Sequence, residues 1–278
     1  MATTFLSEKQ RQRLSHLPEK IDEGELIQYF TLSPSDLSII PNTSAPHTKL
    51  GFVISLCCLR FIGFVPESLG NTPESVIRFI DKQFGFHSSC VLLEQYGARA
   101  QTKSDHLTAI AKHFGFVRIR ENYRQQLTAW LLKRALEHDR PTLLLKTATE
   151  KLKRDKVIRP TLVHLERLVG SVRDQARRKI YEMLSDILTD QTKFFLDNLL
   201  VVHTETINTK FTWLKQRATS HSPESILTTL AKIKFLHNAD VNHWDLSILN
   251  ANRLKILSRL GKCSTNQALQ RSVPEKEL

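Results

Sequence analysis

The chain contains 278 residues, of which 41% are hydrophobic, and carries a formal net charge of +12. This length allows about two domains, and the hydrophobic content is that of an ordinary globular protein. No apolar run reaches the roughly 18 to 20 residues of a membrane span, and the N-terminus lacks the basic and apolar segments of a secretory signal. We therefore expect a cytoplasmic globular protein without a membrane segment.

Helix-capping patterns open the chain. The segments from Ser7 to Gln10 and from Asp22 to Glu25 fit the capping box, in which an oxygen-bearing side chain accepts a hydrogen bond from the third helical amide. They predict helices over residues 8–14 and 23–30. A Ser or Thr directly before a proline is a further start signal, because proline suits the first helical turn. Starts of this kind are predicted at Ser33, Thr72 and Ser222.

Residues 49–63 read KLGFVISLCCLRFIG and form an almost unbroken apolar run between Lys49 and Arg60. At helical spacing, apolar side chains cover nearly all sides of this segment. It is therefore predicted to be a helix buried in the core of an N-terminal domain. Two later apolar segments end in Phe84 and Phe114, and the glycine after each is expected to end a helix.

Two longer amphipathic patterns occupy the middle of the chain. Residues 121–137 repeat apolar side chains at helical spacing, which predicts an amphipathic helix. The same spacing continues over residues 160–188, so this segment is predicted to be the longest helix. Only residues 116–119 show the alternation that is typical of a strand, and they show it weakly. The sequence therefore predicts an all-α, multi-helical fold.

Prolines and a charged segment interrupt the helical pattern between residues 140 and 160, which indicates a boundary between two helical subdomains. Residues 105–114 and 121–137 flank a glycine turn and predict a helix-turn-helix in the first subdomain. The predicted divisions are an N-terminal helical domain at residues 1–140, a basic helical domain at 141–262 and a polar tail at 263–278.

Positive charge is concentrated in the middle of the chain. Residues 1–100 hold 9 Lys or Arg and 10 Asp or Glu, whereas residues 103–179 hold 19 and 8. Such a local excess creates a field that attracts phosphates. The alternatives are a solvated basic face without a ligand and, for residues 151–156, a solvated connector. The residues selected as candidate DNA contacts are Arg60, Lys103, Lys112, Arg118, Arg120, Arg124, Lys133, Arg134, Lys151, Lys153, Arg154, Lys156, Arg173, Arg177 and Arg178.

No pattern in the chain indicates catalysis or metal binding. The Ser-containing GxSxG elbow, the Walker loop and the HExxH helix are absent from the sequence. Cys57 and Cys58 lie inside the apolar run and are expected to be small buried hydrophobes, while no two cysteines have the Cys-x-x-Cys spacing. The histidines lack the partners of a zinc site and are expected to lie at the surface or in hydrogen bonds. We predict no enzyme activity, no metal, no cofactor and a reducing compartment.

Several short motifs, taken together in order and spacing, carry a family resemblance over roughly residues 5–260. In chain order they are Phe5-Leu6-Ser7, Leu50-Gly51-Phe52, Leu59-Arg60-Phe61-Ile62-Gly63, Phe114-Gly115-Phe116, Trp130-Leu131, Ile158-Arg159-Pro160, Leu196-Asp197-Asn198-Leu199-Leu200 and Trp213-Leu214-Lys215. With these motifs the chain resembles the N-terminal region of the replicative transposases of the Tn-three class, whose bacterial transposons end in short inverted repeats.

The resemblance implies the DNA-recognition end of a transposase. Its expected partner is double-stranded DNA that carries the terminal inverted repeats, with another transposase chain as a further partner. The family's three catalytic carboxylates, which hold metal ions for strand transfer, lie in a C-terminal region that this chain does not contain. One departure is Val117, because the family often places a basic residue at that position. The alternative readings are a helical module that binds another transposase chain, and an inactive transposase remnant.

Overall fold

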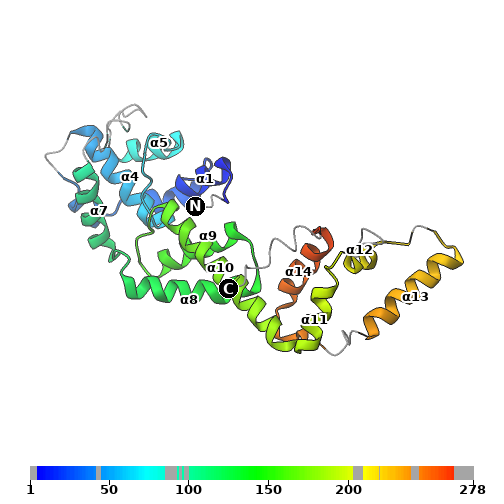
Figure 1. Ribbon diagram of the computed structural model, residues 1–278. Coiled ribbons are helices and arrows are strands. Elements are labelled where there is room, and N and C mark those ends of the chain that lie inside the picture. The colour runs from blue at the N-terminus through cyan, green and yellow to red at the C-terminus, as the bar shows by residue number, and fades with distance from the viewer. Residues whose placement is uncertain are drawn as a thin grey trace. The chain divides into compact units, whose positions relative to one another are not determined.

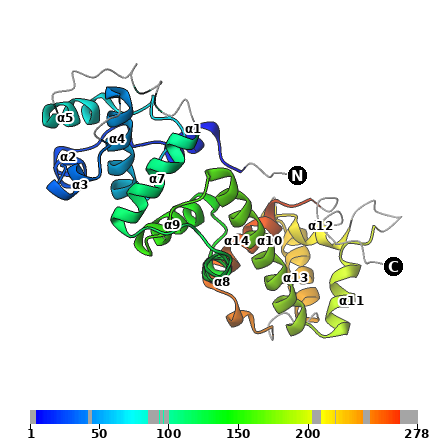
Figure 2. The same cartoon turned by 90° about the vertical axis from the view of Figure 1, so that its left-hand side faces the viewer.

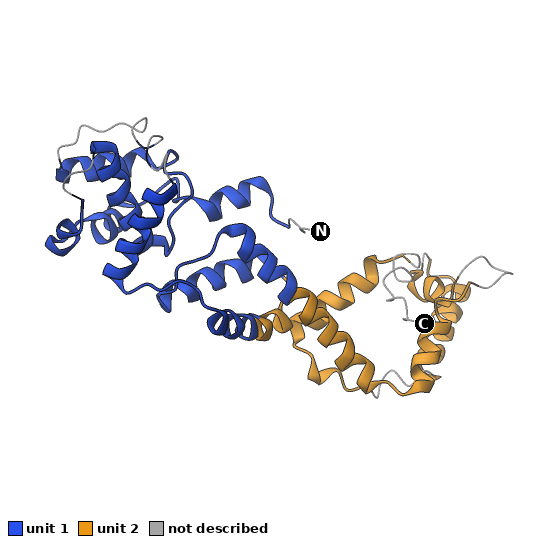
Figure 3. Cartoon of the chain, turned by 60° about the vertical axis from the view of Figure 1, so that its left-hand side comes forward, with its two compact units in different colours: residues 1–131, 140–172 blue, residues 132–139, 173–278 orange. Residues whose placement is uncertain are grey.

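The computed structural model describes residues 5–41, 45–84, 93, 96, 100–202, 209–218, 220–238 and 244–265. Within these ranges the regular elements are helices, shown along the chain in Figure 1, so the predicted all-α fold is confirmed. Contacts within the chain define two compact units (Figure 3). Unit 1 comprises residues 1–131 and 140–172, and unit 2 comprises residues 132–139 and 173–278.

Unit 1 opens with three short capped helices, α1 (Glu8–Ser15), α2 (Glu23–Phe30) and α3 (Pro34–Ser38). At α1 the Ser7 hydroxyl accepts a hydrogen bond from the Gln10 amide, and the Gln10 side chain accepts one from the Ser7 amide. The same reciprocal pair is present at the first turns of α2 and α3. The three predicted starts are therefore confirmed, because each depends only on residues within one helical turn.

Helix α4 (Pro46–Ile62) forms the centre of unit 1. Every residue from 50 to 59 is buried, as the apolar run predicts. The helix packs against α2 and against α7 (Ala100–Phe114), and Figure 2 shows it between them. It ends at Gly63, whose φ of +79° is the left-handed conformation that glycine adopts without steric cost. Helix α5 (Glu74–Phe84) packs on α2.

Three other predicted features belong to this region: a helix start at Thr72 and helix ends at Gly85 and Gly115. The Thr72 hydroxyl donates a hydrogen bond to the Leu69 carbonyl at 2.6 Å, and α5 begins at Glu74. Gly115 has a φ of +72° and follows the end of α7, as predicted. Gly85 lies outside the described residues.

Three longer helices follow, α8 (Glu121–Glu137), α9 (Pro141–Arg154) and α10 (Leu162–Ile187). At 26 residues α10 is the longest helix in the described part of the chain, as predicted. The segment predicted as a boundary is instead helix α9, whose Leu144, Leu145, Ala148 and Leu152 are buried. These side chains share one helical face, so α9 belongs to unit 1 and the division differs from the one predicted at residue 140.

Unit 2 contains α11 (Asp190–Asn198), α12 (Lys210–Lys215), α13 (Pro223–Asn238), the short 3₁₀ helix η2 (Leu246–Ile248) and α14 (Ala251–Cys263), together with the ends of α8 and α10. The predicted start at Ser222 is confirmed, since its hydroxyl accepts a hydrogen bond from the Ser225 amide. Most of the predicted polar tail, residues 266–278, lies outside the described residues. None of the helices described has the length and apolar character needed to cross a bilayer.

Candidate nucleic-acid interface

A parallel β-bridge between Val117 and Val157 joins two loops of unit 1. The Val117 amide donates to the Lys156 carbonyl at 2.9 Å, and the Ile158 amide donates to the Val117 carbonyl at 2.9 Å. The weak strand signal at residues 116–119 corresponds to this one parallel bridge. Lys156 has a φ of +52°, and its ammonium group donates to the Phe114 carbonyl at 3.0 Å. The loop after α7 is therefore held against the loop after α9.

Asp155 joins the same two regions through its carboxylate. The Tyr123 hydroxyl and the Lys151 ammonium group each donate to it at 2.7 Å. The hydrogen bond from Lys151, followed by the one from Tyr123, lowers the pKa of Asp155 below its usual value. Burial raises the pKa of Tyr123, and the carboxylate beside it raises that pKa further. The first turn of α8 is thereby fixed to the end of α9.

These contacts gather exposed basic side chains from three helices and the loops between them. We call this group the bridge cluster. All six members are exposed, and all six are among the predicted DNA contacts. Its members are Lys112, Arg118, Arg120, Arg124, Arg154 and Lys156.

The ion pairs of the bridge cluster are weak. Arg124 lies 3.7 Å from Glu121, with both side chains largely exposed, and Arg154 lies 3.5 Å from Asp155. Pairs of this kind contribute little to stability and exchange readily for other anions. The bridge cluster therefore carries an excess of positive charge that is available to phosphates.

The predicted helix-turn-helix is only partly realised. Both predicted helices form, as α7 and α8. Their connection, residues 115–120, is longer than the three- or four-residue turn of that motif. It also pairs with the loop after α9 through Val117. The joint is thus a junction of three helices, which the spacing of two helices could not reveal.

Arg60 is a predicted DNA contact, but its guanidinium group is hydrogen-bonded within the protein. Its Nε donates to the Tyr29 carbonyl at 2.9 Å, and its Nη1 lies 3.0 Å from Asp36, which is buried. Its Nη2 donates to the Thr31 carbonyl at 3.1 Å. With its side chain only 22% exposed, Arg60 ties α4 to the α2–α3 connection.

Three predicted lysines are likewise bound within unit 1 and, unlike Lys156, are only partly exposed. Lys103 donates to the Glu67 carbonyl at 2.9 Å, and Lys151 is paired with Asp155. Lys153 donates to the Phe61 carbonyl, and burial lowers the pKa of its ammonium group. These lysines position the cluster and the core helix rather than project into solvent.

Unit 2 holds the remaining predicted residues. Arg173 is paired with Asp139 at 2.7 Å, whereas Arg177 and Arg178, one turn further along α10, are exposed. Lys179 beside them is also exposed; it is not among the predicted contacts, although helical periodicity places it on the polar side of α10. We call Arg177, Arg178 and Lys179 the α10 cluster. On α8, Lys133 is exposed and Arg134 is half-buried.

Two cysteines and two histidines described in unit 1 have structural roles. Cys57 and Cys58 are buried, as predicted, and burial raises the pKa of the Cys57 thiol to about 12. His106 Nδ1 lies 2.9 Å from the Tyr96 hydroxyl, and His113 Nε2 lies 3.0 Å from Asp36. In the part of the chain that is described, no group of three or more His, Cys, Asp or Glu side chains could hold a metal ion.

Residues 5–172 match the family model described as a domain of unknown function, DUF4158, and the chain belongs to this family. The matched residues span α1 to the first part of α10, and they include the whole bridge cluster. The matched segment therefore covers most of unit 1, from its capped N-terminal helices to the junction of α7, α8 and α9.

The chain is also similar to bacterial transposases. It is 33% identical to the transposase for transposon Tn1546 of Enterococcus faecium over 259 residues, which are 92% of this chain and 26% of that protein. It is 28% identical to the Escherichia coli transposase for transposon Tn21 and to the Pseudomonas aeruginosa transposase for Tn501, each over 98% of this chain and 27% of the relative. The resemblance to Tn-three transposases is confirmed, and the chain spans about a quarter of the length of these relatives.

Proposed function

We propose that this chain is a DNA-binding module of a Tn-three type transposase that recognises the terminal inverted repeats of the transposon. The observation that carries the proposal is the bridge cluster, in which six exposed cations from α7, α8, α9 and their loops gather on one junction. The relatives are transposases by name, which makes DNA the expected polyanion.

In this proposal phosphates provide most of the affinity. Each phosphate neutralised by Lys or Arg releases counterions, which contributes about −0.9 to the slope of log K against log salt. Specificity then comes from a few contacts to base edges, where a mismatch costs about 1 to 3 kcal/mol. The hydrogen bond from Tyr123 of α8 to Asp155, directly after α9, holds these two helices together, so their backbones would need little ordering on binding.

No chemical step is assigned to these residues. Strand cleavage and joining are assigned to the part of the transposase polypeptide that lies outside the matched quarter. The role of the described residues is to hold the transposon end in register.

A titration with two DNA duplexes tests the proposal. Fluorescence anisotropy would compare a duplex carrying the terminal inverted repeat with a scrambled duplex of equal length and composition. We expect binding to the repeat to be at least about tenfold tighter at physiological salt, and both affinities to fall steeply as salt is raised. Equal affinity for the two duplexes would contradict specific recognition.

Charge reversal separates DNA binding from the alternative of a protein-interaction module. The double variant Arg118→Glu/Arg120→Glu should lose binding to both duplexes. The control Lys9→Glu/Arg13→Glu introduces the same charge change on exposed residues of α1, away from the bridge cluster, and should retain most of the affinity. If both double variants bind like the unchanged chain, the bridge cluster is not the DNA interface.

A further inference from the structure

Unit 1 contains a cavity of about 460 Å³, which we call the Arg159 cavity. One wall is α1, a second is the loop after α4, and a third is the loop between α9 and α10 with the first turn of α10. Its described lining residues include no member of the bridge cluster. A cavity of this size can hold a small organic molecule.

Arg159 brings a buried positive charge to the wall of this cavity. The residue is only 8% exposed, and its Cζ lies 3.3 Å from the centre of the Phe64 ring, which lines the same cavity. Nη1 donates to the Leu14 carbonyl at 2.7 Å, whereas Nε is buried and has no hydrogen-bond partner among the described residues. Burial lowers the pKa of the guanidinium to about 10, against a smaller opposing effect of Glu67. One described acceptor therefore serves a group with five N–H donors.

The nearby carboxylates do not neutralise Arg159. Glu166 is paired with Arg11 at 2.8 Å. Glu8 and Glu67 line the cavity but are exposed, and no ion pair joins Arg159 to a carboxylate in the described part of the chain. Buried charges in proteins are normally paired, so the guanidinium of Arg159 is suited to an anion that enters the cavity.

The first turn of α10 adds hydrogen-bond donors to the same cavity. Residues 161–163 line it, directly after Arg159 and Pro160. The first amides of a helix have no acceptor within the helix and lie at the positive end of its dipole. The first turn of α10 contains no acidic residue, and the Thr161 hydroxyl lies 2.6 Å from His164 Nδ1. A helix N-terminus beside an arginine is an arrangement that binds phosphate groups.

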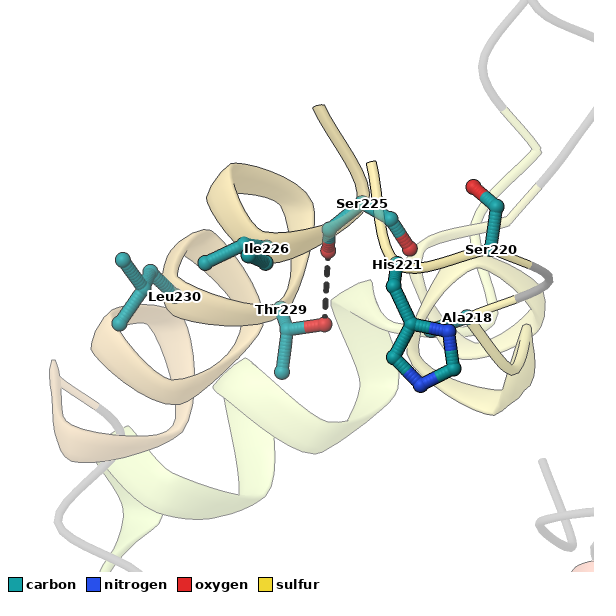
Figure 4. Close-up of a pocket in the computed structure, with 7 residues that line it drawn as sticks. All are labelled: Ala218, Ser220, His221, Ser225, Ile226, Thr229 and Leu230. Atoms are coloured by element: carbon teal, nitrogen blue, oxygen red, sulfur yellow. Dashed lines mark hydrogen bonds between the residues drawn. The ribbon is translucent and has the colours of Figure 1, made fainter. Parts of the chain in front are cut away.

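A hollow in unit 2 provides a contrast. It has a volume of about 340 Å³ and lies between α13 and the segment that precedes this helix (Figure 4). Its described lining residues include no Lys or Arg, and His221 is the titratable residue among them. The first turn of α13 contains Glu224, and the Ser222 hydroxyl accepts the hydrogen bond from the Ser225 amide. The features that suit an anion are those of the Arg159 cavity.

We propose that the Arg159 cavity binds an organic phosphate, whose phosphate group lies between the guanidinium of Arg159 and the first amides of α10. The paired N–H groups of a guanidinium match the oxygens of a phosphate, and the helix dipole favours its negative charge. The organic part lies along apolar side chains of the wall, among them Phe64, Val65 and Leu107. Because no bridge-cluster residue takes part, this inference does not rest on the proposed function.

Calorimetric titration of the full chain with AMP and with adenosine provides the first test. The two ligands share the base and the sugar, and only AMP carries a phosphate. We expect AMP to bind at least about tenfold more tightly than adenosine, because the charge-assisted hydrogen bonds are made to the phosphate. Inorganic phosphate should compete with AMP. Absence of AMP binding, or equal binding of adenosine, would overturn the proposal.

Two sources supply this chemistry, a free nucleotide and a nucleotide of a DNA strand. Competition with the terminal-repeat duplex distinguishes them. Displacement of AMP by the duplex assigns the phosphate to DNA, and simultaneous binding assigns it to a free nucleotide. Arg118→Glu/Arg120→Glu should bind AMP in either case, because both positions lie outside the lining of the cavity. Failure of DNA recognition by the bridge cluster is thereby distinguished from failure of this site.

A matched pair of substitutions locates the site. Val163 is 44% exposed and lines the cavity in the first turn of α10, so Val163→Glu places a carboxylate where the phosphate should lie. A glutamate at this position also suits the helix dipole, so the fold should be retained. AMP binding should weaken by at least about tenfold, because like charges repel at short range. Leu143→Glu makes the same change in the first turn of α9, outside the cavity lining, and should bind AMP like the unchanged chain.

Two further variants test the role of charge. Arg159→Ala should abolish AMP binding, and circular dichroism would check its fold because the hydrogen bond to the Leu14 carbonyl is also lost. Glu67→Gln removes a carboxylate from the cavity wall and should tighten AMP binding. If Val163→Glu binds AMP as tightly as Leu143→Glu, or if Glu67→Gln weakens binding, the phosphate does not lie beside Arg159 and the proposal is overturned.

Discussion

The Nε of Arg173 donates to Asp139 Oδ1 at 2.7 Å, and each side chain is only about one-fifth exposed, at 20% and 21%. Asp139 also lies 3.6 Å from the guanidinium of Arg253, which is buried. One carboxylate therefore serves two arginines at the meeting of α8, α10 and α14. Arg173 has a role in holding unit 2 together that its neighbours in the α10 cluster do not share.

Truncation of Arg173 and of Arg178 to alanine should affect different properties, the first mainly stability and the second mainly DNA binding. Arg173→Ala removes a charge-assisted hydrogen bond and should lower the free energy of unfolding by about 2 kcal/mol. Arg178→Ala, at an exposed position, should change it by less than about 0.5 kcal/mol but weaken DNA binding. Urea unfolding and DNA titration of both variants would check this. Equal stability of the two variants would show that the pair with Asp139 contributes nothing.

Asp155→Asn should destabilise unit 1. The substitution removes the ion pair with Lys151 and places an amide beside two donors, so we expect a loss of about 1 kcal/mol in the free energy of unfolding. Asp174→Asn is the control, because Asp174 is exposed and lies 3.7 Å from Arg177. Both free energies would be measured by urea unfolding. If Asp155→Asn leaves the free energy of unfolding unchanged, Asp155 does not hold α8 and α9 together.

Gly51→Ala should also destabilise unit 1, even though alanine is the better helix former by about 1 kcal/mol. A Cβ at position 51 of α4 would overlap the ring of Tyr96. Crowding of this kind costs about 1 to 3 kcal/mol. Gly261→Ala in α14 has no atom within 4 Å of its new methyl group and should be neutral or stabilising. Thermal unfolding that ranks the two variants in the reverse order would contradict the packing at Gly51.

His106 should make the stability depend on pH. Burial lowers the pKa of this imidazole, against a smaller opposing effect of Asp105, so the folded chain binds fewer protons than the unfolded chain. The stability that His106 contributes is therefore fully present above the imidazole pKa of the unfolded chain, which is about 6.5. It is lost as pH falls from there through the lower pKa of the folded chain. The free energy of unfolding should decrease between about pH 7 and pH 5. His106→Gln should flatten this decrease, and an unchanged slope would exclude His106 as its source.

The local features of this chain could be predicted, because their causes lie within one helical turn. Ser7, Asp22 and Ser33 cap helices through residues three positions away, and the apolar run of α4 defines a buried helix by itself. The concentration of positive charge in residues 103–179 is likewise visible in the sequence itself. The hydrogen-bond and ion-pair partners of the basic side chains could not be predicted, because they depend on tertiary contacts.

Arg60 and the bridge between Val117 and Val157 illustrate the part that the sequence did not reveal. Arg60 reads as a free cation at a helix end, yet its acceptors lie 24 to 31 residues away on the α2–α3 segment. The bridge joins loops that helical periodicity treats as unrelated. Which cations remain exposed is therefore a property of the folded chain rather than of its composition.

Hydroxyl-radical footprinting of a transposon end would show which backbone positions of the DNA the bridge cluster contacts. The DNA would contain the terminal inverted repeat and an equal length of flanking sequence. We predict protection of backbone positions within the repeat, little protection of the flank, and loss of the footprint with Arg118→Glu/Arg120→Glu. Uniform protection of repeat and flank at the same protein concentration, or a footprint that survives the double substitution, would contradict recognition of the repeat by the bridge cluster.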